Sequence, residues 1–168
     1  SERGVGGFLA LWVIGYGIVQ SFAPRLLAGG GRHVDEVAAT QRWGLLLAGV
    51  SVAIATLVAA DVAVTTAIVG GLIVFGVVFA MNSSLHSFLV LVFANDEDVA
   101  LDVGFYYSAN AAGRLVGTLL SGVLYLWGDL AAALGGSAVL VVLAWLLSLR
   151  LPPMPATTVS LATVDAGD

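Results

Sequence analysis

The chain contains no cysteine, which excludes a disulfide bond and any metal site built on thiolate ligands. It also contains no lysine, so its basic residues are all arginines, and no function follows from that choice. Only 10% of its 168 residues are charged, whereas a soluble domain carries about 25%. Because so few polar side chains cannot cover the surface of a water-soluble protein, we interpret the chain as an integral membrane protein.

A basic patch is also missing. The formal net charge is −5, and binding to nucleic acid requires basic side chains that neutralise phosphates, so we expect no nucleic-acid partner. The sequence shows no basic segment, short apolar core and small-residue cleavage site in that order, and hence no signal peptide. It begins without methionine, almost directly at an apolar run, and we therefore expect it to be a fragment of a longer protein.

Five long apolar runs dominate the sequence, whose mean hydropathy is +1.03. A helix needs about 20 mostly apolar residues to cross a bilayer core. The runs do not alternate between polar and apolar residues, so we do not expect a β-barrel. We predict an all-α, polytopic membrane helix bundle over residues 1–150 and a polar, disordered cytoplasmic tail over residues 151–168. The five predicted transmembrane helices cover residues 4–23, 43–60, 62–94, 103–127 and 130–149.

Prolines and length define several of these boundaries. Pro24 ends the first run, and Pro152 and Pro153 follow the last, because proline is poorly tolerated inside a helix. The third run is about 50 Å long as a helix, at 1.5 Å per residue, which exceeds one bilayer core. We predict one long helix there, in preference to a bend near residues 81–84.

The arginines outside the runs indicate an orientation. Arg25, Arg32, Arg42 and Arg150 fall on one side of the predicted membrane, and Arg3 falls on the other. Because Lys and Arg are enriched on the cytoplasmic side, we expect the C-terminus in the cytoplasm and the N-terminus outside. The predicted location is the inner cell membrane, as a multi-pass protein.

Polar residues are concentrated in the first, third and fourth runs. The second and fifth runs carry only scattered serine and threonine. Residues four apart lie on one helical face, and the polar residues follow this spacing. They are Trp12, Tyr16 and Gln20 in the first run, Asn82 and His86 in the third, and Tyr106, Asn110, Arg114 and Thr118 in the fourth, where Tyr107 lies beside Tyr106.

Arg114 lies near the middle of the fourth run, and the nearest acidic residues along the chain are Asp102 and Asp129. An arginine at the centre of a membrane helix costs about 2.5–3.5 kcal/mol on insertion scales. This cost is tolerated where the side chain faces an aqueous cavity or a partner. Beside it, a small-residue face allows another helix to approach closely, as small residues do in membrane helices; we define this face as Gly113, Gly117 and Ser121.

The order of polar and apolar helices resembles the C-terminal half of the major facilitator superfamily. In each half of that family the first, second, fourth and fifth of six helices line the central cavity, and the third and sixth face lipid. The five runs would correspond to helices 8–12. The family's two halves are related repeats with the substrate near the midplane, so the resemblance implies missing N-terminal helices that complete the transporter.

Three stretches resemble one branch, the organoarsenical efflux permeases of the ArsJ type. They are WVIGYGIVQSFAPRLL (12–27), NSSLHSFLVLVF (82–93) and VGFYYSANAAGRLVGTLLSG (103–122). The resemblance implies efflux of a small organic anion, 1-arseno-3-phosphoglycerate, and hence arsenic resistance. The planar guanidinium of Arg114 suits a phosphate or carboxylate. The predicted substrate-binding residues are Arg114, Asn110, Tyr107, Tyr106, Asn82, Tyr16 and Gln20.

We interpret His86 as a proton-coupling candidate for an antiporter, because histidine titrates near neutral pH. Each of these residues also has a structural interpretation. Arg114 would be held by a carboxylate of the missing half or by helix-end carbonyls, and His86 would be a packing element. Asn82 would satisfy backbone groups at a bend, while Tyr16 and Gln20 would be interfacial anchors.

An enzyme is not expected. Ser83 and Ser87 flank His86, but a nucleophile needs a base that a third group orients, and the sequence offers none. We predict no cofactor and no metal ion. The Gly29–Arg32 segment lacks the lysine and spacing of a phosphate-binding loop, and we interpret it as a connector. The alternatives to anion efflux are a permease for a drug or a sugar and a noncatalytic membrane assembly subunit.

Overall fold

The computed structural model describes residues 2–28, 36–94 and 98–153, and the side chains of residues 2, 3, 24 and 26–28 are not described. Nearly all of the described chain is helical, and it contains no strand. The all-α prediction is therefore confirmed for this part of the chain. The helices are α1 (Glu2–Ala28), α2 (Glu36–Ala59), α3 (Val64–Phe93) and α4 (Val99–Ser148).

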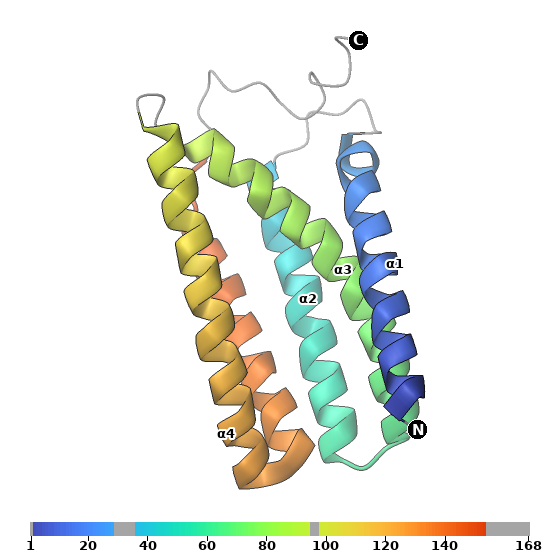
Figure 1. Cartoon of the computed structure of the whole chain (residues 1–168). Coiled ribbons are helices and arrows are strands. Elements are labelled where there is room, and N and C mark those ends of the chain that lie inside the picture. The colour runs from blue at the N-terminus through green and yellow to red at the C-terminus, as the bar shows by residue number, and fades with distance from the viewer. Residues whose placement is uncertain (1, 29–35, 95–97, 154–168) are drawn as a thin grey trace.

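The long helix α4 is interrupted at Gly128 and Asp129. Their backbone angles are not helical (φ −157°, ψ 33° and φ 57°, ψ −156°). Two antiparallel arms result, the first arm over residues 99–127 and the second over 130–148 (Figure 1). A Cβ atom on Gly136 would collide with the Leu124 side chain, so the arms approach closely because position 136 has no side chain.

The helices are arranged in the spatial order α1, α3, α2, α4 (Figure 1). The central helix α2 packs against both α3 and α4, whereas α1 packs only against α3 among the described helices. The buried core is small and lies mainly on α2 and α3, with Leu47 and Ile54 on one helix and Met81, Leu85 and Leu89 on the other.

Most apolar side chains face outward. Leu11 is 71% exposed and Leu126 is 84% exposed, although both are large and apolar. All four helices are long and apolar enough to cross a membrane. Outward-facing apolar side chains on helices of this length suit a protein embedded in lipid, where burial inside the protein is not the only way to avoid water.

Several predicted boundaries differ from the observed ones. Pro24 does not end α1, which continues to Ala28, and α2 begins at Glu36, ahead of Trp43. Hydropathy marks the part of a helix inside the bilayer, whereas backbone hydrogen bonding extends into the polar flanks. The third run forms one continuous helix, α3, as predicted. From residue 154 onward, the predicted disordered tail lies outside the described residues. The predicted Gly29–Arg32 connector also lies outside them.

Candidate functional site

Four aromatic residues join α1 to α3, and we name them the aromatic ladder: Trp12, Tyr16, Phe75 and Phe79. Tyr16 stacks on Trp12 with ring centroids 6.0 Å apart and on Phe79 at 5.6 Å. Phe79 in turn stacks on Phe75 at 5.6 Å. Trp12, Tyr16 and Phe79 thus connect the predicted polar face of α1 to the middle of α3, and Gln20, one turn beyond Tyr16, is half-buried.

Trp12 is fixed by a hydrogen bond in addition to stacking. Its indole Nε1 donates to the carbonyl oxygen of Leu72 at 2.6 Å. The ring lies over Gly76, and a Cβ atom at that position would be 2.9 Å from Nε1. Because Gly76 follows Leu72 by one helical turn, its missing side chain leaves the Leu72 carbonyl accessible to the indole.

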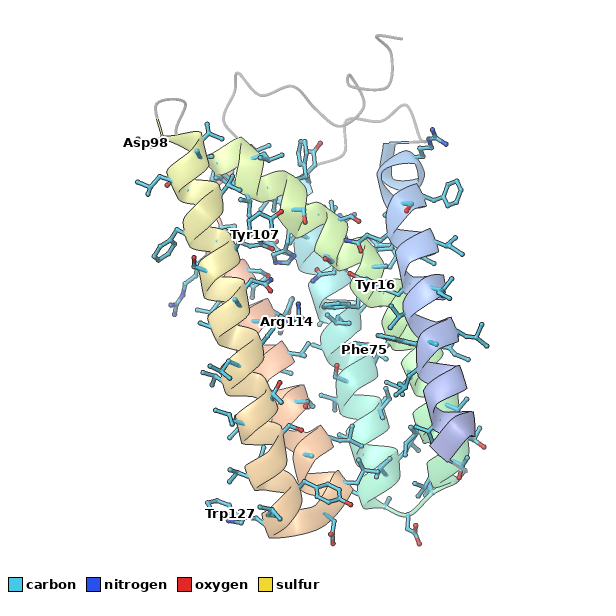
Figure 2. The ribbon with its side chains drawn as sticks, in the orientation of Figure 1. Tyr16, Phe75, Asp98, Tyr107, Arg114 and Trp127 are labelled. Carbon is cyan, nitrogen blue, oxygen red and sulfur yellow. The ribbon has the colours of Figure 1, made fainter. Side chains whose placement is uncertain are left out.

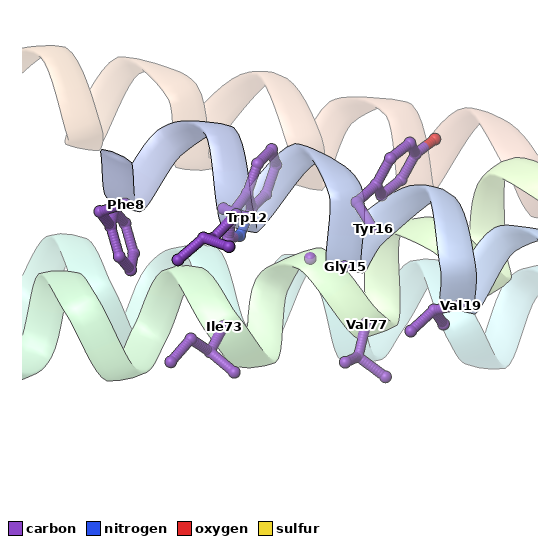
Figure 3. A pocket seen from close by; sticks show the side chains of 9 residues that line it. Phe8, Trp12, Gly15, Tyr16, Val19, Ile73 and Val77 are labelled. Carbon is purple, nitrogen blue, oxygen red and sulfur yellow. The ribbon is translucent and has the colours of Figure 1, made fainter. Parts of the chain in front are cut away.

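An apolar cavity of about 290 Å³ lies between α1 and α3 beside the ladder. Figure 3 shows the Tyr16 hydroxyl pointing away from Ile73 and Val77 on the opposite wall. This cavity offers no charged group to an anion. Its lining consists of Phe8, Leu11, Trp12, Gly15, Tyr16, Val19, Ile73, Gly76 and Val77.

A second cavity of about 270 Å³ lies between α2, α3 and the second arm of α4, and we name it the Asn82 cavity. Asn82 is buried, and its side-chain Oδ1 has no hydrogen-bond partner in the described structure. His86 lines the same cavity, and its Nδ1 lies 2.9 Å from the backbone oxygen of Asn82. The complete lining is Gly44, Leu47, Phe79, Asn82, His86, Leu140, Val141, Ala144, Trp145 and Ser148.

The first arm of α4 carries the remaining candidates, which we name the first-arm group: Tyr106, Tyr107, Asn110 and Arg114. The rings of Tyr106 and Tyr107 meet edge to face with centroids 5.6 Å apart. Asn110 and Arg114 are exposed, and Arg114 has no ion-pair partner within the described residues. Figure 2 shows Tyr107 and Arg114 along this arm and Tyr16 and Phe75 on the neighbouring α1–α3 pair.

The small-residue face also lies on the first arm. Cβ atoms built on Gly113 or Gly117 would meet nothing within 4 Å apart from their own helix. Ser121 is half-buried. In the described structure this face therefore has no helix packed closely at the two glycines.

The structure brings the candidates of α1 and α3 together but keeps the first-arm group apart. Phe79 contacts Tyr16 on one side and lines the Asn82 cavity on the other, so it links the two helices. By contrast, α4 makes few contacts with α3 and none with α1 in the described structure. Arg114 and Asn82 thus belong to two separate groups.

Sequence reasoning missed a set of contacts between α2 and the second arm. Gln41 donates through Nε2 to the Ser148 carbonyl oxygen at 3.3 Å, and its own carbonyl oxygen accepts from Trp145 Nε1 at 3.1 Å. Gly44 allows this approach, since a Cβ there would lie 3.3 Å from Trp145 Cδ1. In the sequence, Gln41 lies just before the predicted run 43–60, and Trp145 lies inside the predicted run 130–149. These two hydrogen-bonding side chains next to apolar runs were the only signal that could have indicated the contacts.

No protein-family model, curated protein or solved structure matches the chain. Among the described residues, no group of three or more His, Cys, Asp or Glu side chains could hold a metal ion. Any assignment of function therefore depends on the residues themselves and on their placement.

Proposed function

We propose that the chain is the C-terminal part of a secondary active transporter of the major facilitator type. In this proposal it crosses the inner membrane five times, through α1, α2, α3 and the two arms of α4, and ends in the cytoplasm. The break at Gly128 and Asp129 supports two crossings within α4, because each arm is about 30–45 Å long at 1.5 Å per residue, enough to span a bilayer core.

The packing of the apolar crossings supports the same interpretation. The two crossings without a polar face, α2 and the second arm, pack against one another through Gln41, Gly44 and Trp145. The crossings that carry polar faces are left on the outside of this pair. In the proposal, this pair holds α1, α3 and the first arm around it, and the missing N-terminal helices complete a pathway between their polar residues.

The exposed guanidinium of Arg114 is the observation that carries the proposal. It lies in the interior of an apolar arm and is followed by Leu115 and Val116, which are 63% and 60% exposed. An unpaired arginine facing lipid at this depth is costly. In the proposal the guanidinium faces an aqueous pathway bordered by the missing N-terminal helices.

The substrate in this proposal is a small organic anion, such as an organoarsenical phosphoglycerate. A guanidinium binds phosphate or carboxylate through two parallel N–H···O bonds. Asn110 lies one turn from Arg114 on the same helical face, and Tyr106 and Tyr107 lie about one further turn back along α4. In the proposal that end of the arm faces the cytoplasm. Tyr16, Gln20 and Asn82 are the corresponding candidates on α1 and α3, and His86 is the proton-coupling candidate.

Replacing Arg114 in the full-length transporter tests this function. Arg114→Ala should lower export of the organoarsenical anion from vesicles at least about tenfold, since a charged hydrogen bond is worth about 1.5–3 kcal/mol. Arg114→Lys should retain part of the activity, because it keeps the charge but loses the planar fork. The matched control is Arg150→Ala, at an exposed arginine beyond the end of α4.

Sugar phosphates and lipophilic drugs assayed in parallel rank the substrate classes. Undiminished anion export by Arg114→Ala, at equal protein levels, would contradict the proposal.

The second candidate is a noncatalytic membrane assembly subunit. The small-residue face favours it, because Gly113 and Gly117 have open space where another helix could pack. Gly117→Leu should release the partner helix from an assembly subunit of this kind. In a transporter the same change should lower transport.

A further inference from the structure

One face of the first arm of α4 is apolar between residues 105 and 127, and we name it the apolar stripe. Its members recur at intervals of three, four or seven residues, which places them on one side of the helix. All of them are exposed: Phe105, Ala112, Val116, Leu119, Val123 and Trp127. At 3.6 residues per turn, Trp127 lies about 140° around the arm from Arg114, so the stripe and the guanidinium belong to different faces.

The apolar stripe is about as long as the hydrocarbon core of a bilayer is thick. Phe105 and Trp127 are 22 residues apart, which corresponds to about 33 Å of helix, and the core is about 30 Å thick. The second arm gives a similar length, because the segment between Asp129 and Arg150 contains no charged residue and corresponds to about 32 Å of helix. Both arms therefore fit one membrane, with a boundary near the break at Gly128 and Asp129.

The connection between α2 and α3 supports the same boundary. It contains Asp61 and lies at the same end of the bundle as the break in α4 (Figure 1). Between Arg42 and Asp61, which are 19 residues apart, the chain carries no charged residue, and this separation corresponds to about 28 Å of helix. Charged residues thus delimit crossings of similar length in α2 and in the second arm.

Trp127 lies at this boundary, at the end of the first arm (Figure 2), and is 83% exposed. Trp12 and Trp145 donate their indole N–H groups to backbone oxygens of the protein, whereas the indole of Trp127 has no such acceptor among the described residues. Tryptophan is enriched at membrane–water interfaces, because its ring stays in apolar surroundings while its N–H reaches polar groups. Trp127 has the exposure, the unpaired donor and the position for this role.

Lipid fits the apolar stripe better than another protein helix does. Helices approach one another closely in membranes where small residues line the contact. The small-residue face of this arm points elsewhere, since Gly117 lies about 100° around the helix from Val116. The stripe itself ends in two large aromatic side chains, Phe105 and Trp127, which keep a neighbouring backbone at a distance.

We propose that lipid acyl chains cover the apolar stripe and that Trp127 anchors the first arm at the membrane–water interface near the break in α4. There its indole N–H donates to an acceptor of the lipid headgroup region. The inference rests on the proposed crossing of the membrane by the first arm, and not on transport or on a substrate. The anchor also sets the depth of Arg114, which lies 13 residues from Trp127, or about 20 Å along the helix.

Tryptophan fluorescence in vesicles of brominated lipids tests the proposal, because bromine quenches only the rings that it reaches. The contribution of Trp127 is the signal of the whole protein minus that of Trp127→Phe. Bromine placed near the headgroup should quench this contribution at least about twofold more strongly than bromine at the ends of the acyl chains, as expected for a ring at the interface.

Trp145→Phe is the matched control, because Trp145 packs between α2 and the second arm and donates to Gln41. The contribution of Trp145 should be quenched less than that of Trp127 by lipids of either kind. A second measurement leaves Trp127 in place. A nitroxide attached to Val116→Cys should collide with oxygen more often than with a water-soluble nickel complex, since oxygen is concentrated among the acyl chains.

Stronger quenching of Trp127 by bromine at the chain ends would overturn the proposal, because the ring would then lie inside the hydrocarbon core. Absence of quenching by either lipid would also overturn it, since protein or water would then surround the ring. So would a nitroxide at position 116 that collides mainly with nickel. An interfacial Trp127 together with undiminished transport by Arg114→Ala would contradict the proposed function and leave this inference standing.

Discussion

Glycines at single positions decide how closely the helices of this bundle approach. The Trp12 ring lies over Gly76, the Trp145 side chain lies close to Gly44, and the Leu124 side chain lies close to Gly136. The polar candidates Tyr16, Asn82 and Arg114 were identifiable from the sequence, because polar residues in apolar runs are conspicuous. The glycines that receive large side chains were not, because the chain has 21 glycines and nothing local distinguishes those that have a neighbour across the bundle.

Gly76→Ala should destabilise the α1–α3 pair. The added Cβ would lie 2.9 Å from Trp12 Nε1 and 3.1 Å from Cε2, so the rigid indole must move and its hydrogen bond to Leu72 is lost. Overpacking of this kind typically costs about 1–3 kcal/mol. The measurement is equilibrium unfolding in micelles, followed by tryptophan fluorescence.

Gly70→Ala is the control, because a Cβ at Gly70 meets nothing within 4 Å on the same helix. We expect it to be neutral or slightly stabilising, as alanine favours helix over glycine. If Gly76→Ala and Gly70→Ala have the same free energy of unfolding, the close approach of Trp12 to Gly76 does not stabilise the α1–α3 pair.

The helices themselves show which part of the fold the sequence determines locally. Their approximate positions follow from the five long apolar runs, of which the last two fall within the single helix α4, on either side of its break at Gly128 and Asp129. Their ends do not follow, because α2 starts at Glu36 on a polar flank that hydropathy does not recognise. The helix end predicted at Pro24 is also wrong, because α1 continues through Pro24 to Ala28.

Asp129→Gly should stabilise the turn between the two arms. Asp129 adopts φ 57° and ψ −156°, a region that glycine occupies without strain and other residues occupy at about 1–3 kcal/mol. We therefore expect a gain of about 1 kcal/mol in the free energy of unfolding. Asp129→Ala is the control, since it removes the carboxylate but keeps the Cβ, and it should give no gain.

The measurement is again equilibrium unfolding in micelles. An equal gain from both variants would show that the charge of Asp129 destabilises the turn, not its backbone conformation.

The whole molecule combines a closely packed apolar pair, α2 and the second arm of α4, with α1, α3 and the first arm, which carry the polar residues, around it. Sequence reasoning predicted which helices are polar, but not that Arg114 and Asn82 would lie in separate groups. That separation depends on the order α1, α3, α2, α4 in space, which arises from side chains far apart in the sequence, such as Gln41 and Trp145. The proposed transport pathway requires the first arm of α4 to present one face to water and another to lipid.

Cysteine accessibility distinguishes these two faces directly, because the chain has no cysteine of its own. Arg114 and Leu115 are both exposed in the structure, yet they project about 100° apart around the first arm. We expect a cysteine introduced at position 114 of the whole protein in membranes to react with a hydrophilic thiol reagent at least about tenfold faster than one introduced at position 115. Equal rates, or faster reaction at position 115, would contradict the claim that Arg114 faces an aqueous pathway.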